Sequence, residues 1–185
     1  MRTLGEAFGA CRRQILWMAL IAAASLALSF VFACAAPFAA LAALASLRLT
    51  RRQAAVIVVA GLLANQAIGF GVLDYPSDSL TMAWGAAMAA ATLAALFSAD
   101  AAASFLSNSH GLVRGGASFS VAFLAYEVAL YVAALALGGA EAAFAGATIR
   151  QVFLIDASSF IGLLALERVL LAIGLSTRPA AVASA

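Results

Sequence analysis

The chain has 185 residues, of which 66% are hydrophobic and only 10% are charged, and its mean hydropathy is +1.09. A soluble domain is about half apolar and about a quarter charged, so this composition excludes an ordinary water-soluble protein. The net charge of +2 comes with scattered arginines and no lysine, which excludes a nucleic-acid-binding surface. We therefore expect one all-α transmembrane domain over residues 1–185, with the lipid bilayer as its solvent.

Hydropathy predicts six transmembrane helices, over residues 12–31, 34–50, 53–73, 80–98, 115–138 and 148–174. The first apolar stretch, from Ile15 to Leu47, would be about 50 Å long as one helix, whereas the hydrocarbon core of a bilayer is about 30 Å thick. We divide it near Pro37, because proline is tolerated in the first turn of a helix. The longest polar connection runs from Ser98 to Arg114 and is compatible with a short interfacial helix.

The distribution of charge orients these helices. With the N-terminus in the cytoplasm, the cytoplasmic ends carry most of the arginines, namely Arg2, Arg12, Arg13, Arg48, Arg51, Arg52, Arg114 and Arg178. The outer loops carry the acids Asp74, Asp78 and Glu141, with Arg150 as an exception. This is the positive-inside pattern, which a single helix over residues 15–47 would break. We expect six spans, both termini inside, in a bacterial inner membrane.

Polar and aromatic residues gather where the third helix gives way to the fourth. Residues 74–78, DYPSD, predict a tight turn, because proline sets φ and aspartate and serine hydrogen-bond nearby backbone groups. An aromatic belt at the membrane interface would explain Tyr75 and Trp84. It would not explain the carboxamide side chains of Asn65 and Gln66, which lie deeper. A mostly apolar pocket with a few polar groups is typical of a ligand site. We interpret this region as the mouth of such a site, formed by Asn65, Gln66, Phe70, Tyr75 and Trp84.

Two acids occur at membrane depth farther along the chain. Glu127 lies near the middle of the fifth helix, where a carboxylate is costly unless it faces the protein interior or a wet cavity. Tyr131 follows one turn later on the same face. The pair either lines a ligand pocket or proton site, or Glu127 is protonated and joins two helices. Asp156, in the last helix, is expected to pair with Arg150 or to face the same cavity as Glu127.

Motifs for catalysis are absent from the sequence. The single histidine, His110, is predicted to be cytoplasmic, which rules out a histidine-based metal site and a Ser-His-Asp arrangement. There is no phosphate-binding loop. Glu167 and Arg168 are expected to have a structural role, pairing with each other or with neighbours. We therefore expect a protein that is not an enzyme and carries no cofactor.

Six short helices, cytoplasmic termini and the stretch Ala64–Gly85, ANQAIGFGVLDYPSDSLTMAWG, together resemble the substrate-binding S component of energy-coupling-factor (ECF) vitamin transporters. The architectural resemblance covers the whole chain, whereas the motif covers only that stretch. Within this family the stretch is most similar to the cobalamin-type, BtuM-like group.

The resemblance implies that the chain captures a vitamin, with cobalamin suspected, from the outer side. It implies a transmembrane coupling protein and ATPases as partners, docked on an AxxxA surface of the first helices, for which either Ala23/Ala27 or Ala35/Ala39/Ala43 is a match. BtuM-like proteins often carry a cysteine that coordinates cobalt. Cys34 is the one cysteine near the outer face here, and residues 65–84 contain none.

Two other functions remain open. The chain could be a non-catalytic accessory or assembly subunit of a larger inner-membrane complex, in which case Asn65, Gln66 and Glu127 should point at a partner helix. It could also be a small channel or proton-coupled carrier, a hypothesis that depends on Glu127 and Asp156.

Overall fold

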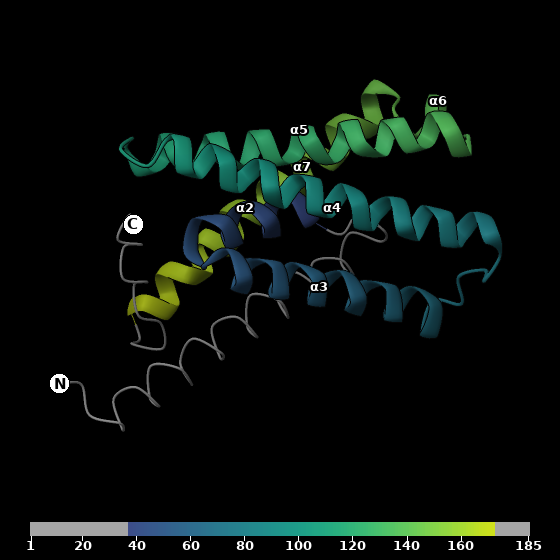
Figure 1. Ribbon diagram of the computed structural model, residues 1–185, viewed down its shortest axis with the longest axis horizontal. Helices are drawn as coiled ribbons and strands as arrows, with labels where there is room; N and C mark the ends of the chain where they lie inside the picture. Colours follow the sequence, from purple (N-terminus) through teal and green to yellow (C-terminus); the bar gives the residue numbers. More distant parts are fainter. Residues whose placement is uncertain (1–36, 173–185) are drawn as a thin grey trace.

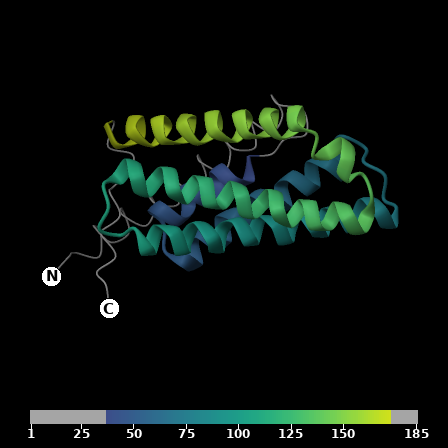
Figure 2. The same cartoon turned by 90° about the horizontal axis from the view of Figure 1, so that it is seen from above.

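The computed structural model describes residues 37–172, and all the regular structure among them is helical (Figure 1). The predicted first helix over residues 12–31 and Cys34 lie outside the described residues. The helices are α2 (Phe38–Arg48), α3 (Arg51–Gly71), α4 (Ser79–Phe105), α5 (Gly111–Leu137), α6 (Ala140–Ala143) and α7 (Gly146–Ala172). Figure 2 shows α7 along one side of the other long helices, and Figure 1 shows that it runs obliquely to α4 and α5. The prediction of an all-α bundle is therefore confirmed.

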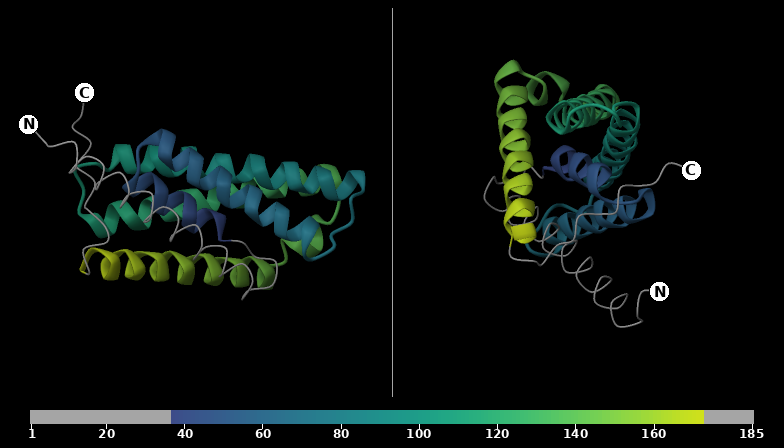
Figure 3. Two further views of the ribbon diagram at one scale, coloured as in Figure 1. Left: turned by 90° about the horizontal axis from the view of Figure 1, so that it is seen from below. Right: turned by 90° about the vertical axis from the view of Figure 1, so that its left-hand side faces the viewer.

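α2 is the centre of the bundle. It packs against α3, α4, α5 and α7, and the end-on view in Figure 3 shows it surrounded by these four helices. Nearly all of its residues are buried, from Phe38 to Ser46. Alanine dominates its sequence, and small side chains let neighbouring backbones approach closely from every side. A helix that is apolar all round is expected in such a central position.

α4 and α5 form a long antiparallel hairpin. Each has 27 residues, which corresponds to about 40 Å of helix. The predicted polar connection over residues 98–114 is wrong in extent, because α4 continues to Phe105 and α5 already begins at Gly111. The alanine-rich sequence after Ser98 favours helix despite its polar residues. His110 caps α5 by accepting a hydrogen bond from the Leu112 N–H at 3.4 Å.

One end of the bundle, which we call the arginine end, is held together by three polar contacts. Arg51 Nε donates to Asp100 Oδ2 at 2.6 Å and joins α3 to α4. Arg114 Nε donates to the Ala103 carbonyl at 2.9 Å across the hairpin.

The third contact joins α2 to α7. Arg48 Nε lies 2.7 Å from Glu167 Oε1, although its N–H does not point along this line as a hydrogen bond requires. Glu167 therefore pairs with Arg48 of α2, which is the predicted alternative of a neighbouring partner, rather than with Arg168.

Three of the described helices, α3, α4 and α5, are long and apolar enough to cross a membrane, and α7, which corresponds to the predicted span over residues 148–174, is not among them. The surfaces of these three helices expose large apolar side chains such as Leu63, Phe97, Leu124 and Val132, which is the surface that lipid requires. α2 has 11 residues, or about 16 Å of helix, and is too short to cross a bilayer by itself. The predicted span over residues 34–50 is thus not seen at full length in the described part of the chain.

Candidate functional site

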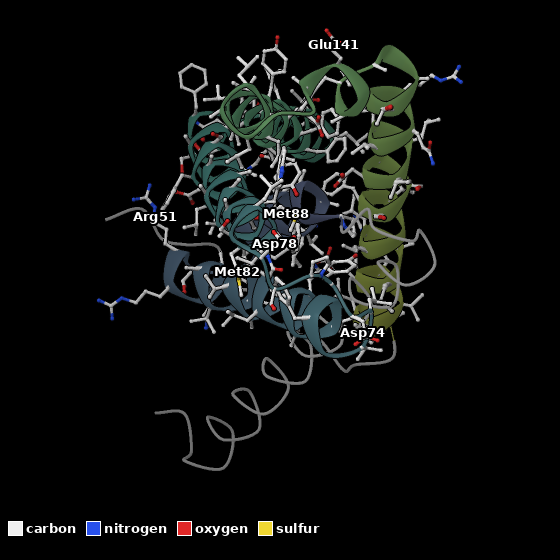
Figure 4. All side chains as sticks on the ribbon, turned by 90° about the vertical axis from the view of Figure 1, so that its right-hand side faces the viewer. Arg51, Asp74, Asp78, Met82, Met88 and Glu141 are labelled. Carbon is white, nitrogen blue, oxygen red and sulfur yellow. The ribbon has the colours of Figure 1, made fainter. Side chains whose placement is uncertain are left out.

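The connection between α3 and α4 is a tight turn, as the sequence predicts. α3 ends at Gly71, and Asp74 adopts a left-handed φ of 51°. Asp78 is the N-cap of α4, and its Oδ1 atom accepts a hydrogen bond from the Thr81 N–H at 2.8 Å. This bond lowers the pKa of the Asp78 carboxyl, because it stabilises the ionised form. Asp74 and Asp78, together with Glu141 of α6, mark what we call the acidic end (Figure 4).

Two of the predicted aromatic residues pack against each other at this turn. Tyr75 folds back over the last turns of α3, and its ring meets Phe70 edge-on, with the centroids 6.3 Å apart. Its backbone N–H donates to the Gly69 carbonyl at 3.0 Å. A Cβ at Gly69 would lie only 2.7 Å from the Tyr75 ring, so glycine is required there by close approach. Phe70 and Tyr75 of the predicted ligand mouth therefore pack together over the end of α3.

The predicted carboxamide pair divides into two environments. Gln66 Nε2 donates to the Gly85 carbonyl at 3.4 Å and so joins α3 to α4. Trp84, beside Gly85, is half-buried. Asn65 is also half-buried, and no hydrogen bond of its side chain to another described residue is recorded. The fold thus gives Gln66 a partner within the bundle but leaves Asn65 without one among residues 37–172.

Asp156 caps a helix to which it does not belong. The N-cap position of α2 is Pro37, whose side chain can accept no hydrogen bond. Asp156 of α7 fills this role, because its Oδ1 atom accepts a hydrogen bond from the Ala40 N–H at 3.0 Å. Asp156 is only 2% exposed. The predicted pairing of Asp156 with Arg150 is wrong, since Arg150 is exposed and the carboxylate faces the start of α2 instead.

The start of α2 also gathers side chains of α5. The ring of Tyr126, which is buried, lies 6.3 Å from that of Phe38. Tyr126 interacts electrostatically with both Asp156 and Glu127, and these two acids interact with each other. Glu127 is half-buried. The alternative in which Asp156 lies near Glu127 is therefore the one that the structure supports.

Tyr126 is not among the site residues that the sequence predicts. Tyr131 is among them, but it lies outside the group of side chains at the start of α2. Tyr131 is 45% exposed and packs edge-on against Phe144, with the ring centroids 5.1 Å apart, so it does not join the group around α2. Tyr126 belongs to a buried stripe of α5 with Phe119 and Ala122. That spacing of three and four residues is the signal by which the sequence could have indicated it.

The polar residues of the bundle lie at a similar distance from the arginine end. Measured along their helices at 1.5 Å per residue, Asn65 lies about 21 Å from Arg51 and Glu127 about 20 Å from Arg114. Asp156 lies about 16 Å from Glu167 on the same scale. We call this level the polar layer, and its members are Asn65, Gln66, Tyr126, Glu127 and Asp156. The fold brings Tyr126, Glu127 and Asp156 together on α5 and α7, but Asn65 and Gln66 are on α3, which contacts neither of these helices.

The continuous apolar core ends at about the polar layer. Every buried residue of α4 lies between Ala91 and Ala103, in the half nearer the arginine end. The buried residues of α3 and α5 lie mostly in the same half, which is where α2 runs. From the polar layer to the acidic end most side chains of α3, α4 and α5 are only partly covered. The bundle is therefore tightly packed at one end and looser at the end where the predicted site residues lie.

One small hollow in the described residues lies away from the polar layer. This hollow of about 20 Å³ beside Arg51, Phe97 and Asp100 has room for about one water molecule. No three histidine, cysteine, aspartate or glutamate side chains of the described part come together as metal ligands. Cys34, the cobalt-ligand candidate, lies outside these residues.

The fold and this polar layer define an all-α protein with membrane-spanning helices. A scan against family models, a search of curated proteins and a search of solved structures each find no match to the chain.

Proposed function

We propose that the chain is a membrane-embedded substrate-binding protein of the S-component type, which binds a vitamin-like small molecule from the outer face. Cobalamin is the suspected ligand. The observation that carries the proposal is the position of the polar layer. Polar side chains within the apolar zone are expensive unless they face an interior or a cavity, and here they lie where the tight packing around α2 ends.

The chemistry of this level suits binding rather than catalysis. Asn65 offers an amide with no recorded partner among the described residues, Tyr126 a hydroxyl, and Glu127 a carboxylate. Phe70, Tyr75 and Trp84 add aromatic surface toward the acidic end. A mostly apolar site with a few polar groups is the usual composition of a small-molecule pocket. The protein is proposed to be non-catalytic, and to pass its ligand to a transmembrane coupling protein driven by ATPases.

The proposed topology has six spans with both termini in the cytoplasm of a bacterial cell. Arg48, Arg51 and Arg114 would then lie at the cytoplasmic face, whereas Asp74, Asp78 and Glu141 would face outward. The first span, predicted over residues 12–31, lies outside the described residues. Attaching a reporter enzyme after Ser77 and after Asn108 tests this orientation. The proposal requires the reporter after Ser77 to lie outside the cell and the reporter after Asn108 to lie in the cytoplasm.

A ligand-stability experiment tests the function directly. The purified protein in lipid nanodiscs is heated with each member of a vitamin panel that includes cobalamin. A ligand present at about 100 times its Kd should stabilise the protein by about 2.7 kcal/mol through mass action. Asn65→Ala and Tyr126→Phe should weaken the response, whereas Ser107→Ala, at the opposite end of the bundle, should not. If no member of the panel raises Tm, the binding function is refuted.

A second candidate is an accessory subunit of a larger membrane complex. The observation in its favour is Glu127, which is half-buried and has no recorded hydrogen bond to another described residue, as expected for a side chain that meets a partner helix. In this case purification in mild detergent should recover stoichiometric partner proteins. Glu127→Ala should then release them, whereas the substrate-binding function predicts a chain that binds its vitamin alone.

A further inference from the structure

The polar layer and the acidic end are biased toward negative charge. The described residues place Glu127 and Asp156 in the polar layer, and Asp74, Asp78 and Glu141 lie beyond it. Arg150, which is exposed, is the one basic residue in this half of the described chain. Arg48, Arg51, Arg52, Arg114 and Arg168 all lie toward the opposite end. A ligand entering from the acidic end therefore meets carboxylates and little positive charge.

The two carboxylates of the polar layer are not equally compensated. Asp156 accepts the Ala40 N–H and lies at the N-terminus of α2, where the backbone N–H groups favour a negative charge. Glu127, on the neighbouring α5, has no basic partner or hydrogen bond recorded among the described residues. Because a lone carboxylate at this depth is costly, Glu127 calls for a positive charge or a proton.

Buried groups around the two acids also point to an occupant. Tyr126 is 7% exposed, interacts electrostatically with both carboxylates, and no hydrogen bond of its hydroxyl to a described residue is recorded. Ser159 lies one turn beyond Asp156 in α7 and is 1% exposed, and its hydroxyl has no hydrogen-bond partner in the described structure. Buried polar groups of native proteins usually have partners. The Ser159 hydroxyl, one turn from Asp156, thus marks a place where a polar ligand group or water completes the structure.

We infer that the ligand carries a positively charged organic nitrogen, which lies against the Glu127 carboxylate and is also attracted by the carboxylate of Asp156. This inference rests on the proposed binding function and specifies the class of its substrate, and it favours a cationic vitamin over cobalamin, which carries no charged organic nitrogen. The rings of Phe38 and Tyr126, with centroids 6.3 Å apart, are buried against each other and form an apolar wall beside the two acids. An anionic vitamin would bring a second negative charge into the same low-dielectric region.

Matched probes separate this inference from the proposed function. The full-length protein in nanodiscs is heated with permanent cations (thiamine and choline), anions (biotin and pantothenate), neutral riboflavin, and sodium chloride as the inorganic control. We expect an organic cation to raise Tm, and Glu127→Gln to lower its affinity about 10- to 100-fold, as for the loss of a charged hydrogen bond. Glu141→Gln, an equivalent change of an exposed acid at the same end, should change the affinity less than about twofold.

The possible results lead to different conclusions. If an anionic or neutral vitamin raises Tm instead, or if sodium alone does so, the cationic class is wrong while the binding function stands. If no organic probe raises Tm and no small molecule is found by mass spectrometry of the purified protein, both fail. Glu127→Asp serves as the folding control, because it keeps the charge. It should retain most of the affinity that Glu127→Gln loses, and equal loss in both variants would overturn the assigned role of the Glu127 charge.

Discussion

Asp156 and Ala40 are separated by 116 positions in the sequence, yet the carboxylate of the first accepts the backbone N–H of the second at 3.0 Å. This bond places the capping group of the central helix on α7. Proline at the N-cap position cannot provide a side-chain acceptor, so the first turn of α2 would otherwise leave its N–H groups without partners in a water-free environment. The start of α2, and the part of the polar layer beside it, therefore depend on the packing of α7 against α2.

Removing this cap should destabilise the bundle. We expect Asp156→Ala to lower the free energy of unfolding by about 1–3 kcal/mol, because a buried N–H loses its acceptor. Asp156→Asn should cost less, since its amide oxygen can still accept. Thermal unfolding in nanodiscs measures both. Arg150→Ala is the control, and a comparable loss there would contradict the assignment of Ala40 as the partner of Asp156.

Gly69 should be intolerant of any side chain. Gly69→Ala brings a Cβ to 2.7 Å from the Tyr75 ring, and we expect a loss of about 1–3 kcal/mol from overpacking. In a Tyr75→Ala background the same substitution should cost much less, because the clash is gone. A double-mutant cycle by thermal unfolding gives the coupling. Additive effects would show that Tyr75 does not pack on Gly69. Gly71→Ala, which meets open space, is the matched control.

The two ion pairs of the arginine end should differ in their contribution to stability. Glu167 is 3% exposed, so Arg48→Ala leaves a buried carboxylate uncompensated and should cost up to about 3 kcal/mol. The Arg51 side chain is 80% exposed, and Arg51→Ala should cost less than about 1 kcal/mol. Parallel chemical unfolding of the two variants tests this order. Equal losses would mean that burial does not govern these pairs.

The Asp78 cap should make α4 sensitive to acid. Its pKa is lower in the folded protein than the ordinary value of 3.8, so its carboxylate stabilises the fold above that value. This stabilisation should disappear as the pH falls below 3.8 and through the lowered pKa. Asp78→Asn also caps a helix but does not titrate. The difference in Tm between the wild type and Asp78→Asn, followed from pH about 6 to about 2, should change in favour of the variant. A difference independent of pH would contradict the role of the ionised cap.

Sequence patterns predict a residue's place best where it acts through its immediate neighbours. The turn over residues 74–78 and the approximate extents of α3, α5 and α7 were predicted from local patterns. Such patterns predict a residue's place less well where long-range packing decides. The stretch after Ser98 was interpreted as a polar connection, but pairing of Asp100 with Arg51 and contact with α5 keep it helical. Gln66 was predicted to bind a ligand, and its recorded partner is the Gly85 carbonyl.

The sequence by itself determined the class of this protein, an all-α bundle with lipid-facing helices and charge divided between its two ends, because composition and hydropathy act along the chain independently of packing. Only the tertiary structure decided the partners of its buried polar groups. It placed Asp156 on Ala40, Glu167 near Arg48, and Tyr126 rather than Tyr131 beside the acids. These contacts join helices far apart in sequence. Their geometry depends on a short central helix whose neighbours no local pattern could identify.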